Sequence, residues 1–203
     1  MPSRNIIKQY GASQYYHIYS RGVAKQNIFN DSQDYGYFLQ LFKRYLSPNA
    51  ESRKHHAPYP CYHNRIKLVA YCLMPNHIHM LIYQEDKDAM TCFMRSLVTS
   101  YVMYFNKKYD RVGPLFQSNY KASLILQAKY LEHITRYIHL NPLDWRNYEY
   151  SSLVYFSGSK STQWLKPEHV LNIFSGFSDY MEFLEEFKDQ KYILCEIQKT
   201  VAG

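Results

Sequence analysis

The sequence predicts an α+β fold of the ferredoxin-like, split-βαβ type: a four-stranded antiparallel sheet with helices on one face, plus a C-terminal helical extension. Two observations indicate this class. Segments with alternating and with helical apolar spacing follow one another in the order β-α-β-β-α-β, and one more helix comes after them. The chain has 203 residues, 46% hydrophobic and 20% charged, which suits a globular domain with a proper core.

The first strand and the first helix differ in their apolar period. Residues 14–20 (QYYHIYS) alternate and are aromatic or β-branched, which favours a strand. Asp31 or Ser32 is placed to cap the helix that follows. Its apolar residues recur at helical spacing: Tyr35, Phe38, Leu39, Phe42 and Leu46. Pro48 ends the helix, and residues 47–65, which are polar and contain several prolines, predict a flexible loop.

The middle of the chain predicts a β-hairpin. Residues 66–73 (IKLVAYCL) are almost entirely apolar, which is typical of a buried strand. Residues 74–76 (MPN) favour a turn, and residues 77–83 (HIHMLIY) favour the return strand. Strands joined by so short a turn pair antiparallel.

A second helix, a fourth strand and a third helix complete the pattern. Asp86 or Asp88 can open the second helix. The apolar residues of this helix share one face: Met90, Phe93, Met94, Leu97, Val98, Tyr101, Val102 and Phe105. Residues 119–126 (NYKASLIL) predict the fourth strand, and residues 127–140 predict the third helix, which Pro142 closes. The face of the sheet away from the helices is expected to stay open for a ligand.

Charge divides the chain at residue 142. Residues 1–142 carry 18 Lys and Arg against 8 Asp and Glu, whereas residues 143–203 carry 6 against 9. We expect a main domain over 1–142 and a partly helical extension over 143–203, with one amphipathic helix around 178–190. The basic main domain suggests a polyanionic partner, and a solvated basic surface is the alternative. The 22 tyrosines, many of them among Lys and Arg, suit stacking on unpaired bases or ordinary packing.

The sequence shows no sign of a membrane or secreted protein. No run of about 18 apolar residues occurs, and the first residues (MPSRNIIKQYGASQ) lack the apolar region of a secretion signal. The cysteines Cys61, Cys72, Cys92 and Cys195 are scattered without a CxxC pair, which indicates neither a zinc knuckle nor a disulfide framework. We therefore expect a cytoplasmic protein.

Two histidines lie in the predicted return strand. Side chains alternate along a strand, so His77 and His79 share one face, while Ile78, Met80 and Ile82 share the face that can bury against the helices. Two neighbouring imidazoles can bind one cation, because neutral histidine is the commonest metal ligand. The alternative is a pair of partly buried histidines whose nitrogens are satisfied by neighbouring groups.

The third helix can supply what the histidine pair lacks. Neither an HxHxDH pattern nor a third alternating histidine follows His79, so a further ligand must come from elsewhere. Tyr137 and Asn141 lie on roughly one helix face, one turn apart. If the Asn141 amide oxygen binds Mg²⁺ or Mn²⁺, the Tyr137 oxygen is placed to attack a phosphodiester that the ion polarises. The alternative is that Tyr137 is a core tyrosine.

Together these segments resemble a known family. The blocks MPNHIHMLI (74–82), YFNKKYDRVGPLFQSNYKA (104–122) and YLEHITRYIHLNP (130–142) follow one another as in the single-tyrosine HUH transposases. They resemble in particular the group associated with repetitive extragenic palindromes (REP). HIYSRG (17–22) is similar to the motif that ends the first strand in such proteins, and the resemblance covers roughly residues 14–155.

The resemblance implies an enzyme, a DNA transposase that depends on Mg²⁺ or Mn²⁺. Such an enzyme cleaves and rejoins single-stranded DNA at hairpin elements by transesterification through a 5′-phosphotyrosine intermediate. The resemblance implies that His77 and His79 are metal ligands required for catalysis, that Tyr137 is the nucleophile and that Asn141 is the third ligand. Asn119 departs from the family pattern, in which arginine is frequent, so one phosphate contact of the family is not expected here.

The implied partner is single-stranded or hairpin DNA, bound by a monomer or a homodimer. Basic residues near the sheet face are the candidates for phosphate contacts, with solvated surface charge as the alternative: Arg21, Lys25, Lys121 and Arg136. Tyr130 is a second candidate nucleophile. It ranks below Tyr137 because Ile134, which cannot be a ligand, follows it one turn later.

Two other functions stay open from the residues alone. One is a nucleic-acid-binding module without catalysis, whose ferredoxin-like sheet presents aromatic residues as an RNA-recognition motif does, although the glycine-aromatic signature of that motif is absent. The other is a metal nuclease in which water attacks the phosphate. The three functions differ in whether a covalent protein–DNA adduct forms and whether DNA is cut.

Overall fold

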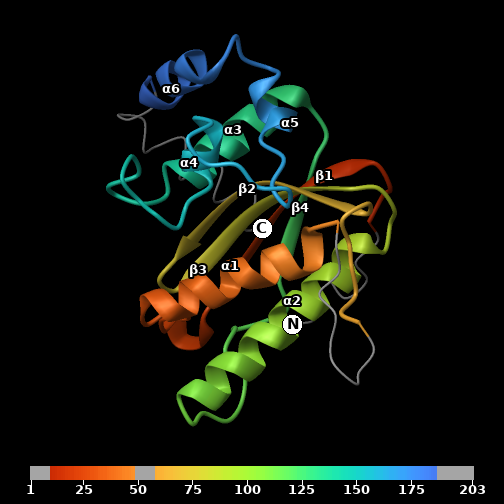
Figure 1. Cartoon of the computed structure of the whole chain (residues 1–203), viewed down its shortest axis with the longest axis vertical. Helices are drawn as coiled ribbons and strands as arrows, with labels where there is room; N and C mark the ends of the chain where they lie inside the picture. Colours follow the sequence, from red (N-terminus) through yellow and green to blue (C-terminus); the bar gives the residue numbers. More distant parts are fainter. Residues whose placement is uncertain (1–9, 49–57, 187–203) are drawn as a thin grey trace, which may run out of the picture.

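Four strands form one antiparallel sheet at the centre of the protein (Figure 1). The computed structural model describes residues 10–48 and 58–186. The strands are β1 (Gln14–Arg21), β2 (Ile66–Met74), β3 (His77–Gln84) and β4 (Lys121–Ile125). Their spatial order is β2-β3-β1-β4, and every neighbouring pair is antiparallel. This is the ferredoxin-like arrangement, so the predicted fold class is confirmed.

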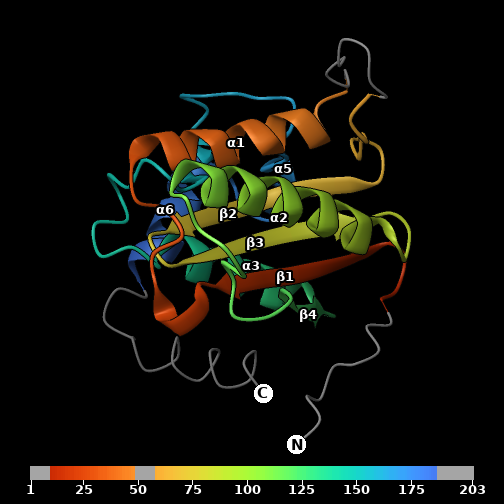
Figure 2. The ribbon, with the colours of Figure 1, turned by 90° about the horizontal axis from the view of Figure 1, so that it is seen from below.

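Two long helices, α1 (Ser32–Leu46) and α2 (Ala89–Lys108), cover one face of the sheet (Figure 2). Asp31 caps α1, because its carboxylate accepts a hydrogen bond from the Asp34 backbone N–H at 3.0 Å. The residues at which the strands and these helices meet are fully buried and apolar: Ile18, Phe38, Phe42, Leu73, Met80, Ile82, Phe93 and Leu97. Burial of these side chains gives the sheet and the helix pair a common core.

The helices that follow β4 lie on the opposite face of the sheet (Figure 1). They are α3 (Ala128–His139), α4 (Leu153–Phe156), α5 (Glu168–Leu171) and α6 (Phe177–Glu185). The expectation of an open second face is wrong. Leu131, Ile134 and Ile138 of α3 are buried in one cluster with Val69 of β2 and Leu81 of β3, because the apolar stripe of α3 needs a surface to cover.

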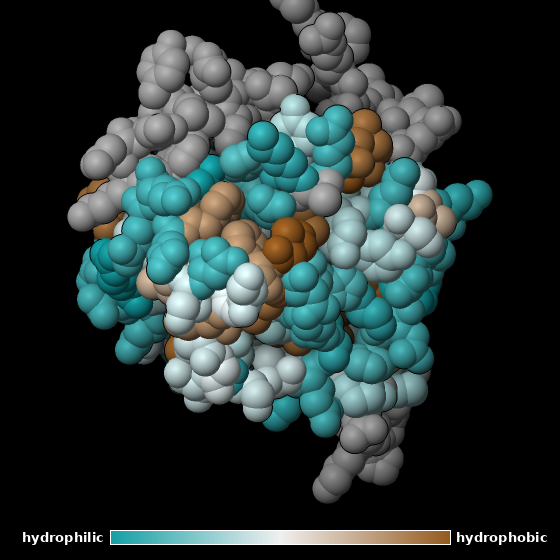
Figure 3. Space-filling model, turned by 90° about the horizontal axis from the view of Figure 1, so that it is seen from above, coloured by the Kyte–Doolittle hydropathy of each residue, from teal (hydrophilic) through white to brown (hydrophobic). Residues whose placement is uncertain are grey.

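Seen from the side of these later helices, the surface is mostly hydrophilic, with apolar side chains between the polar ones (Figure 3). Within the described residues, no helix is long and apolar enough to cross a membrane.

The chain after α3 follows the outer edge of β2. The backbone N–H of Leu73 donates to the carbonyl of Tyr150 at 3.0 Å, and the N–H of Lys166 donates to the carbonyl of Leu68 at 2.8 Å. The extension thus packs directly on the sheet and satisfies backbone groups that an edge strand leaves unpaired. The division of the chain at residue 142 remains a prediction.

The predicted strand and helix bounds agree with the structure to within a few residues. A short 3₁₀ helix, η1 (Val23–Lys25), follows β1. Of the predicted loop 47–65, residues 49–57 lie outside the described part. Its last residues are anchored, since the Tyr62 hydroxyl donates to the Cys92 carbonyl of α2 at 3.1 Å. The predicted helix around 178–190 is α6, and residues 187–190 and Cys195 also lie outside the described part.

Candidate active site

The two histidines of β3 lie on the face of the sheet that α3 covers. In the strand register His77 is opposite Arg21 of β1, and His79 is opposite Tyr19. The two imidazole centroids are 5.0 Å apart. His79 is only 5% exposed, whereas His77 is half-buried at the end of the strand. The alternation of the strand therefore places both imidazoles side by side, and the site is accessible from the His77 end.

The end of α3 brings two more side chains to the histidines. The Tyr137 hydroxyl lies 3.5 Å from Nε2 of His79, and Oδ1 of Asn141 lies 3.1 Å from Nε2 of His77. Tyr137 is buried and Asn141 is half-buried, one helical turn further along the chain. The spacing of four residues thus lets one helix end reach both histidines. These four side chains are the ones that the sequence predicted to meet.

Asn76, in the turn before β3, fixes the orientation of His77. Its Nδ2 donates to the Lys25 carbonyl at 3.3 Å, which turns its Oδ1 toward Nδ1 of His77 at 2.6 Å. An acceptor at this position places the imidazole proton on Nδ1, and we infer the tautomer from these contacts. In this tautomer Nε2 of neutral His77 carries a lone pair that faces Oδ1 of Asn141 at 3.1 Å. A cation bound to both atoms would be compatible with this arrangement.

A third histidine, His17 of β1, packs against the imidazole of His79. Its Nε2 lies 3.0 Å from Nδ1 of His79, and the two rings are nearly parallel with centroids 5.1 Å apart. If Nδ1–H of His79 donates to His17, Nε2 of His79 carries a lone pair toward Tyr137. Nδ1 of His17 is the one buried side-chain nitrogen or oxygen without a partner among the described residues.

His17 is the first residue of the HIYSRG segment (17–22), but its contact with His79 was not predicted from the sequence. Alternation along residues 14–20 already places His17 on one face with Tyr15 and Tyr19. What the alternation cannot give is the register between β1 and β3, which decides that this face is the one with His79. A pairing of the two strands by their apolar faces would have suggested it.

The environment keeps the three imidazoles neutral. Burial lowers the pKa of His79 well below its usual range, and the neighbouring His17 and His77 lower it further. Burial also lowers the pKa of His77, and it lowers the pKa of His17 to about 3. Neutral imidazole is the form that binds a metal ion, so the site is ready for one without first losing protons.

The last turn of α3 is held by a buried hydrogen-bond network. Nδ1 of His139 lies 2.6 Å from the Tyr180 hydroxyl of α6, and its Nε2 lies 2.7 Å from the Ser152 hydroxyl. All three residues are fully buried. Because His139 comes two residues before Asn141, this network fixes the backbone that presents Asn141 and Tyr137.

Three of the four predicted phosphate-binding residues lie around the accessible end of the site. Arg21 is exposed and is the cross-strand neighbour of His77. Lys25 is exposed, and its carbonyl accepts the hydrogen bond from Asn76 in the adjoining turn. Lys121 of β4 is exposed, and its ammonium lies 5.5 Å from the ring centroid of Tyr19. The approach to the histidines is therefore basic.

Arg136 does not fit its predicted role as a DNA contact. It is 3% exposed, and its guanidinium donates to the Phe183 carbonyl at 3.1 Å and lies 4.0 Å from the Phe183 ring centroid. Burial lowers its pKa to about 10. The correction follows from α6, which covers this side of α3 and which the sequence did not place there. Arg136 holds the two helices together.

Tyr130 and Asn119 both lie on the surface of the protein. Tyr130 lies on the first turn of α3 and is 57% exposed, and Asn119 is exposed just before β4. Within residues 10–48 and 58–186, no three His, Cys, Asp or Glu side chains are grouped to hold one ion. The assignment of His77, His79 and Asn141 as ligands of one ion remains a prediction.

The chain matches a family of DNA transposases. The family model described as "Transposase IS200 like" matches residues 12–141, which is more than half of the chain and includes all four side chains at the site. The chain belongs to this family of IS200-like transposases, and the family predicted from its motifs is confirmed. A search of curated proteins finds no match to the chain.

One solved structure shows the same fold. The structure of a REP-associated tyrosine transposase bound to a REP hairpin superposes with a TM-score of 0.56 at 12% identity, covering 80% of this chain and 90% of that chain. A candidate transposase from Deinococcus radiodurans R1 matches with a TM-score of 0.40 at 12% identity, covering 66% of this chain and 92% of that chain. At this identity, the first likeness supports the fold alone.

Proposed function

We propose that this transposase cleaves and rejoins single-stranded DNA at hairpin elements through a covalent bond to Tyr137. One observation carries the proposal: the Tyr137 hydroxyl lies 3.5 Å from Nε2 of His79, beside the contact between His77 and Asn141. All four side chains come from the same chain. We therefore propose that one monomer holds a complete site, whether or not a homodimer forms.

The donor atoms of the site fit a divalent cation. His77 and His79 offer lone pairs on neutral imidazoles, and Asn141 offers an amide oxygen that faces His77 at 3.1 Å. Two atoms at that separation can both reach one ion at bond lengths of about 2.1 Å. We propose that these three residues hold Mg²⁺ or Mn²⁺. Such an ion supplies Lewis-acid polarisation of the scissile phosphate.

Tyr137 would then open the DNA strand by transesterification. Its hydroxyl oxygen attacks the phosphorus, the bond between phosphorus and the 3′ oxygen breaks, and a 5′-phosphotyrosine forms. The phenol proton passes to solvent, and the leaving oxygen becomes a 3′-OH. One phosphoester bond is made for each one broken. Attack of a 3′-OH on the phosphotyrosine therefore rejoins a strand and frees Tyr137 without a nucleotide cofactor.

The basic approach to the site suits the phosphates of the substrate. We propose that Arg21, Lys25 and Lys121 contact the DNA backbone near the cleavage point, since all three are exposed around the accessible end of the site. A hairpin substrate is suggested by the structural neighbour, which is a REP-associated transposase bound to a REP hairpin.

A denaturing gel tests the proposal. Wild-type protein incubated with a labelled hairpin that carries single-stranded flanks and with Mn²⁺ should give cut DNA and a band of protein linked to DNA. Tyr137→Phe should lose both products by at least about a thousandfold, because the variant keeps the ring and loses only the attacking oxygen.

Tyr130→Phe is the matched control, since it makes the same change on an exposed residue of the same helix and should retain activity. Cleavage without a covalent band would instead support a nuclease that uses water. Binding without cleavage would support a module without catalysis.

A further inference from the structure

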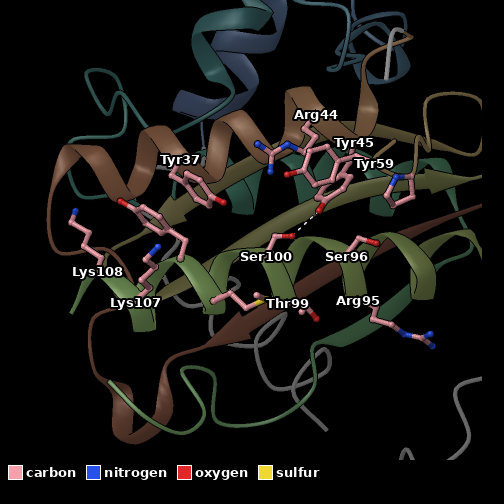
Figure 4. Close-up of a pocket in the computed structure, with 13 residues that line it drawn as sticks. Tyr37, Arg44, Tyr45, Tyr59, Arg95, Ser96, Thr99, Ser100, Lys107 and Lys108 are labelled. Carbon is pink, nitrogen blue, oxygen red and sulfur yellow. Dashed lines mark hydrogen bonds between the residues drawn. The ribbon is translucent and has the colours of Figure 1, made fainter. Parts of the chain in front are cut away.

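A groove on the other side of the sheet has no role in the proposed reaction. It runs between α1 and α2, beside Tyr59 of the loop that precedes β2 (Figure 4). Its volume is about 940 Å³. We call it the α1–α2 groove. Because α1 and α2 lie on the face opposite the histidines, whatever binds here does not reach Tyr137 directly.

The α1–α2 groove is basic. Arg44 of α1 and Arg95 and Lys107 of α2 line it, and none of its described lining residues is acidic. Lys108 also lines the groove, but two carboxylates hold its ammonium at 2.7 and 2.8 Å and compensate its charge. Arg95 and Lys107 are exposed, and no ion pair within the described residues engages them. The groove therefore favours an anionic ligand.

The cations are spaced for a chain of charges. Arg95, Thr99, Met103 and Lys107 recur every four residues along α2, and all four are exposed and line the groove. At 1.5 Å per residue, Arg95 and Lys107 are about 18 Å apart along the helix axis. A nucleic-acid strand carries one phosphate per nucleotide, so it presents several negative charges over that distance. A single phosphate or a small anion would contact only one of the two cations.

Aromatic rings accompany the cations. The rings of Tyr37 and Tyr104 stack at 3.9 Å with an angle of 12°, and both are half-buried at the groove. The guanidinium of Arg44 lies 4.3 Å from the ring centroid of Tyr59. Flat, partly exposed rings beside cations suit unpaired bases, which stack while their phosphates meet positive charge. In a double helix the base faces are hidden, so these rings favour a single strand.

We propose that the α1–α2 groove binds single-stranded DNA, as a second contact remote from the site of cleavage. The choice of DNA over other polyanions rests on the proposed function, in which the substrate has single-stranded flanks. The groove would hold several nucleotides of such a flank through Arg95 and Lys107, with bases against the tyrosine rings.

Fluorescence anisotropy with two labelled hairpins tests the groove, using hairpins with a short flank and with a flank of thymidines long enough to fill it. Wild-type protein should bind the long-flank hairpin more tightly, by about tenfold or more. The double variant Arg95→Gln/Lys107→Gln should lose this difference. Its slope of log affinity against log salt should also fall by about 1.4, at about 0.7 per phosphate contact in a single strand.

The matched control is Lys87→Gln/Lys160→Gln, which removes the same charge at exposed lysines outside the groove and should change neither quantity appreciably. Equal losses in both double variants, or full retention of the long-flank advantage in Arg95→Gln/Lys107→Gln, would overturn the proposal. So would wild-type binding that is equally tight when the flank is a duplex or an abasic strand.

The anisotropy measurement needs no cleavage, so its result tests the groove even if Tyr137 forms no adduct with DNA. Conversely, the groove variant should still form the Tyr137 adduct on the short-flank hairpin. Failure of the groove and failure of the proposed reaction are thereby told apart.

Discussion

The two faces of the sheet are built from the same strands but hold different side chains. Toward α1 and α2, β1 and β3 present Ile18, Met80 and Ile82, all fully buried in an aromatic core. Toward α3, the residues that alternate with these include His17 and His79. A step of one residue along a strand therefore moves from the stabilising core to the candidate site.

The residues that stabilise the fold and the residues of the candidate site therefore lie largely on opposite faces of the sheet. Buried polar groups weaken a fold unless each finds a partner. On the α3 face, His79 and His139 are surrounded by apolar residues, yet each has hydrogen-bond partners on both ring nitrogens. The α1–α2 face holds the larger apolar core, and its buried polar groups, such as Asp34 and the Tyr101 hydroxyl, are also hydrogen-bonded. We expect substitutions on the two faces to act on different measurements.

The largest expected effect is on the α3 face. His77→Ala should abolish cleavage, by at least about 10⁴-fold or about 5.5 kcal/mol in the barrier, while binding of hairpin DNA changes little. A readout without catalysis is the melting temperature, which Mn²⁺ at a hundred times its dissociation constant should raise by several degrees in the wild type but not in the variant. Joint loss of DNA binding and cleavage would indicate a structural histidine.

A core substitution on the α1–α2 face should lower the stability of the protein and leave the cleavage activity of the folded molecules unchanged. Phe38→Ala removes a fully buried ring that contacts Phe29, Phe42 and Tyr101, and it should lower the free energy of unfolding by about 3–5 kcal/mol. Urea unfolding measures this loss, and cleavage per folded molecule at low temperature should be kept. Tyr130→Ala, at an exposed position, should cost less than about 0.5 kcal/mol. A loss below about 1 kcal/mol for Phe38→Ala would contradict the tight core.

The smallest expected effect concerns the ion pair that joins the ends of α1 and α2. Burial alone raises the pKa of Asp34, but hydrogen bonds from Lys108, the Asn30 backbone and tyrosine hydroxyls outweigh burial and hold it below its usual 3.8. A carboxyl with a depressed folded-state pKa adds stability above its unfolded pKa, and that stability is lost as the pH falls through the folded pKa.

Asp34→Asn should therefore cost about 1.5–3 kcal/mol at pH 7, the range for hydrogen bonds to charged groups. The difference from wild type should shrink as the pH falls below 3.8. Thermal unfolding of both proteins at pH values from 7 to 3 measures this difference in stability. A difference that stays constant over this range would contradict the linkage between the Asp34 pKa and stability.

Much of this molecule could be predicted from its sequence, for a physical reason. Strand and helix periods are local properties, so the elements and the alternation at His77 and His79 were visible in single segments. The spacing of Tyr137 and Asn141 is likewise local to one helix. The fold class and the family follow from such local signals taken in order.

The features that the sequence did not predict depend on contacts between segments that are distant in the chain. Arg136 was misplaced because helical periodicity gives the faces of α3 but not the neighbour, α6, that covers one of them. His17 was missed because its role needs the register between β1 and β3. The covered second face of the sheet was missed because the apolar stripe of α3 does not by itself tell which surface it packs on, here β2 and β3.

The hydrogen bond between His139 and Tyr180 ties the helix of the proposed nucleophile to a residue forty-one positions later. A chain that stopped at residue 142 would leave both nitrogens of a buried imidazole unsatisfied at the turn that holds Asn141. The shortest active fragment should therefore reach past Tyr180. Loss of the C-terminal extension during evolution would therefore require simultaneous substitutions in the core around His139.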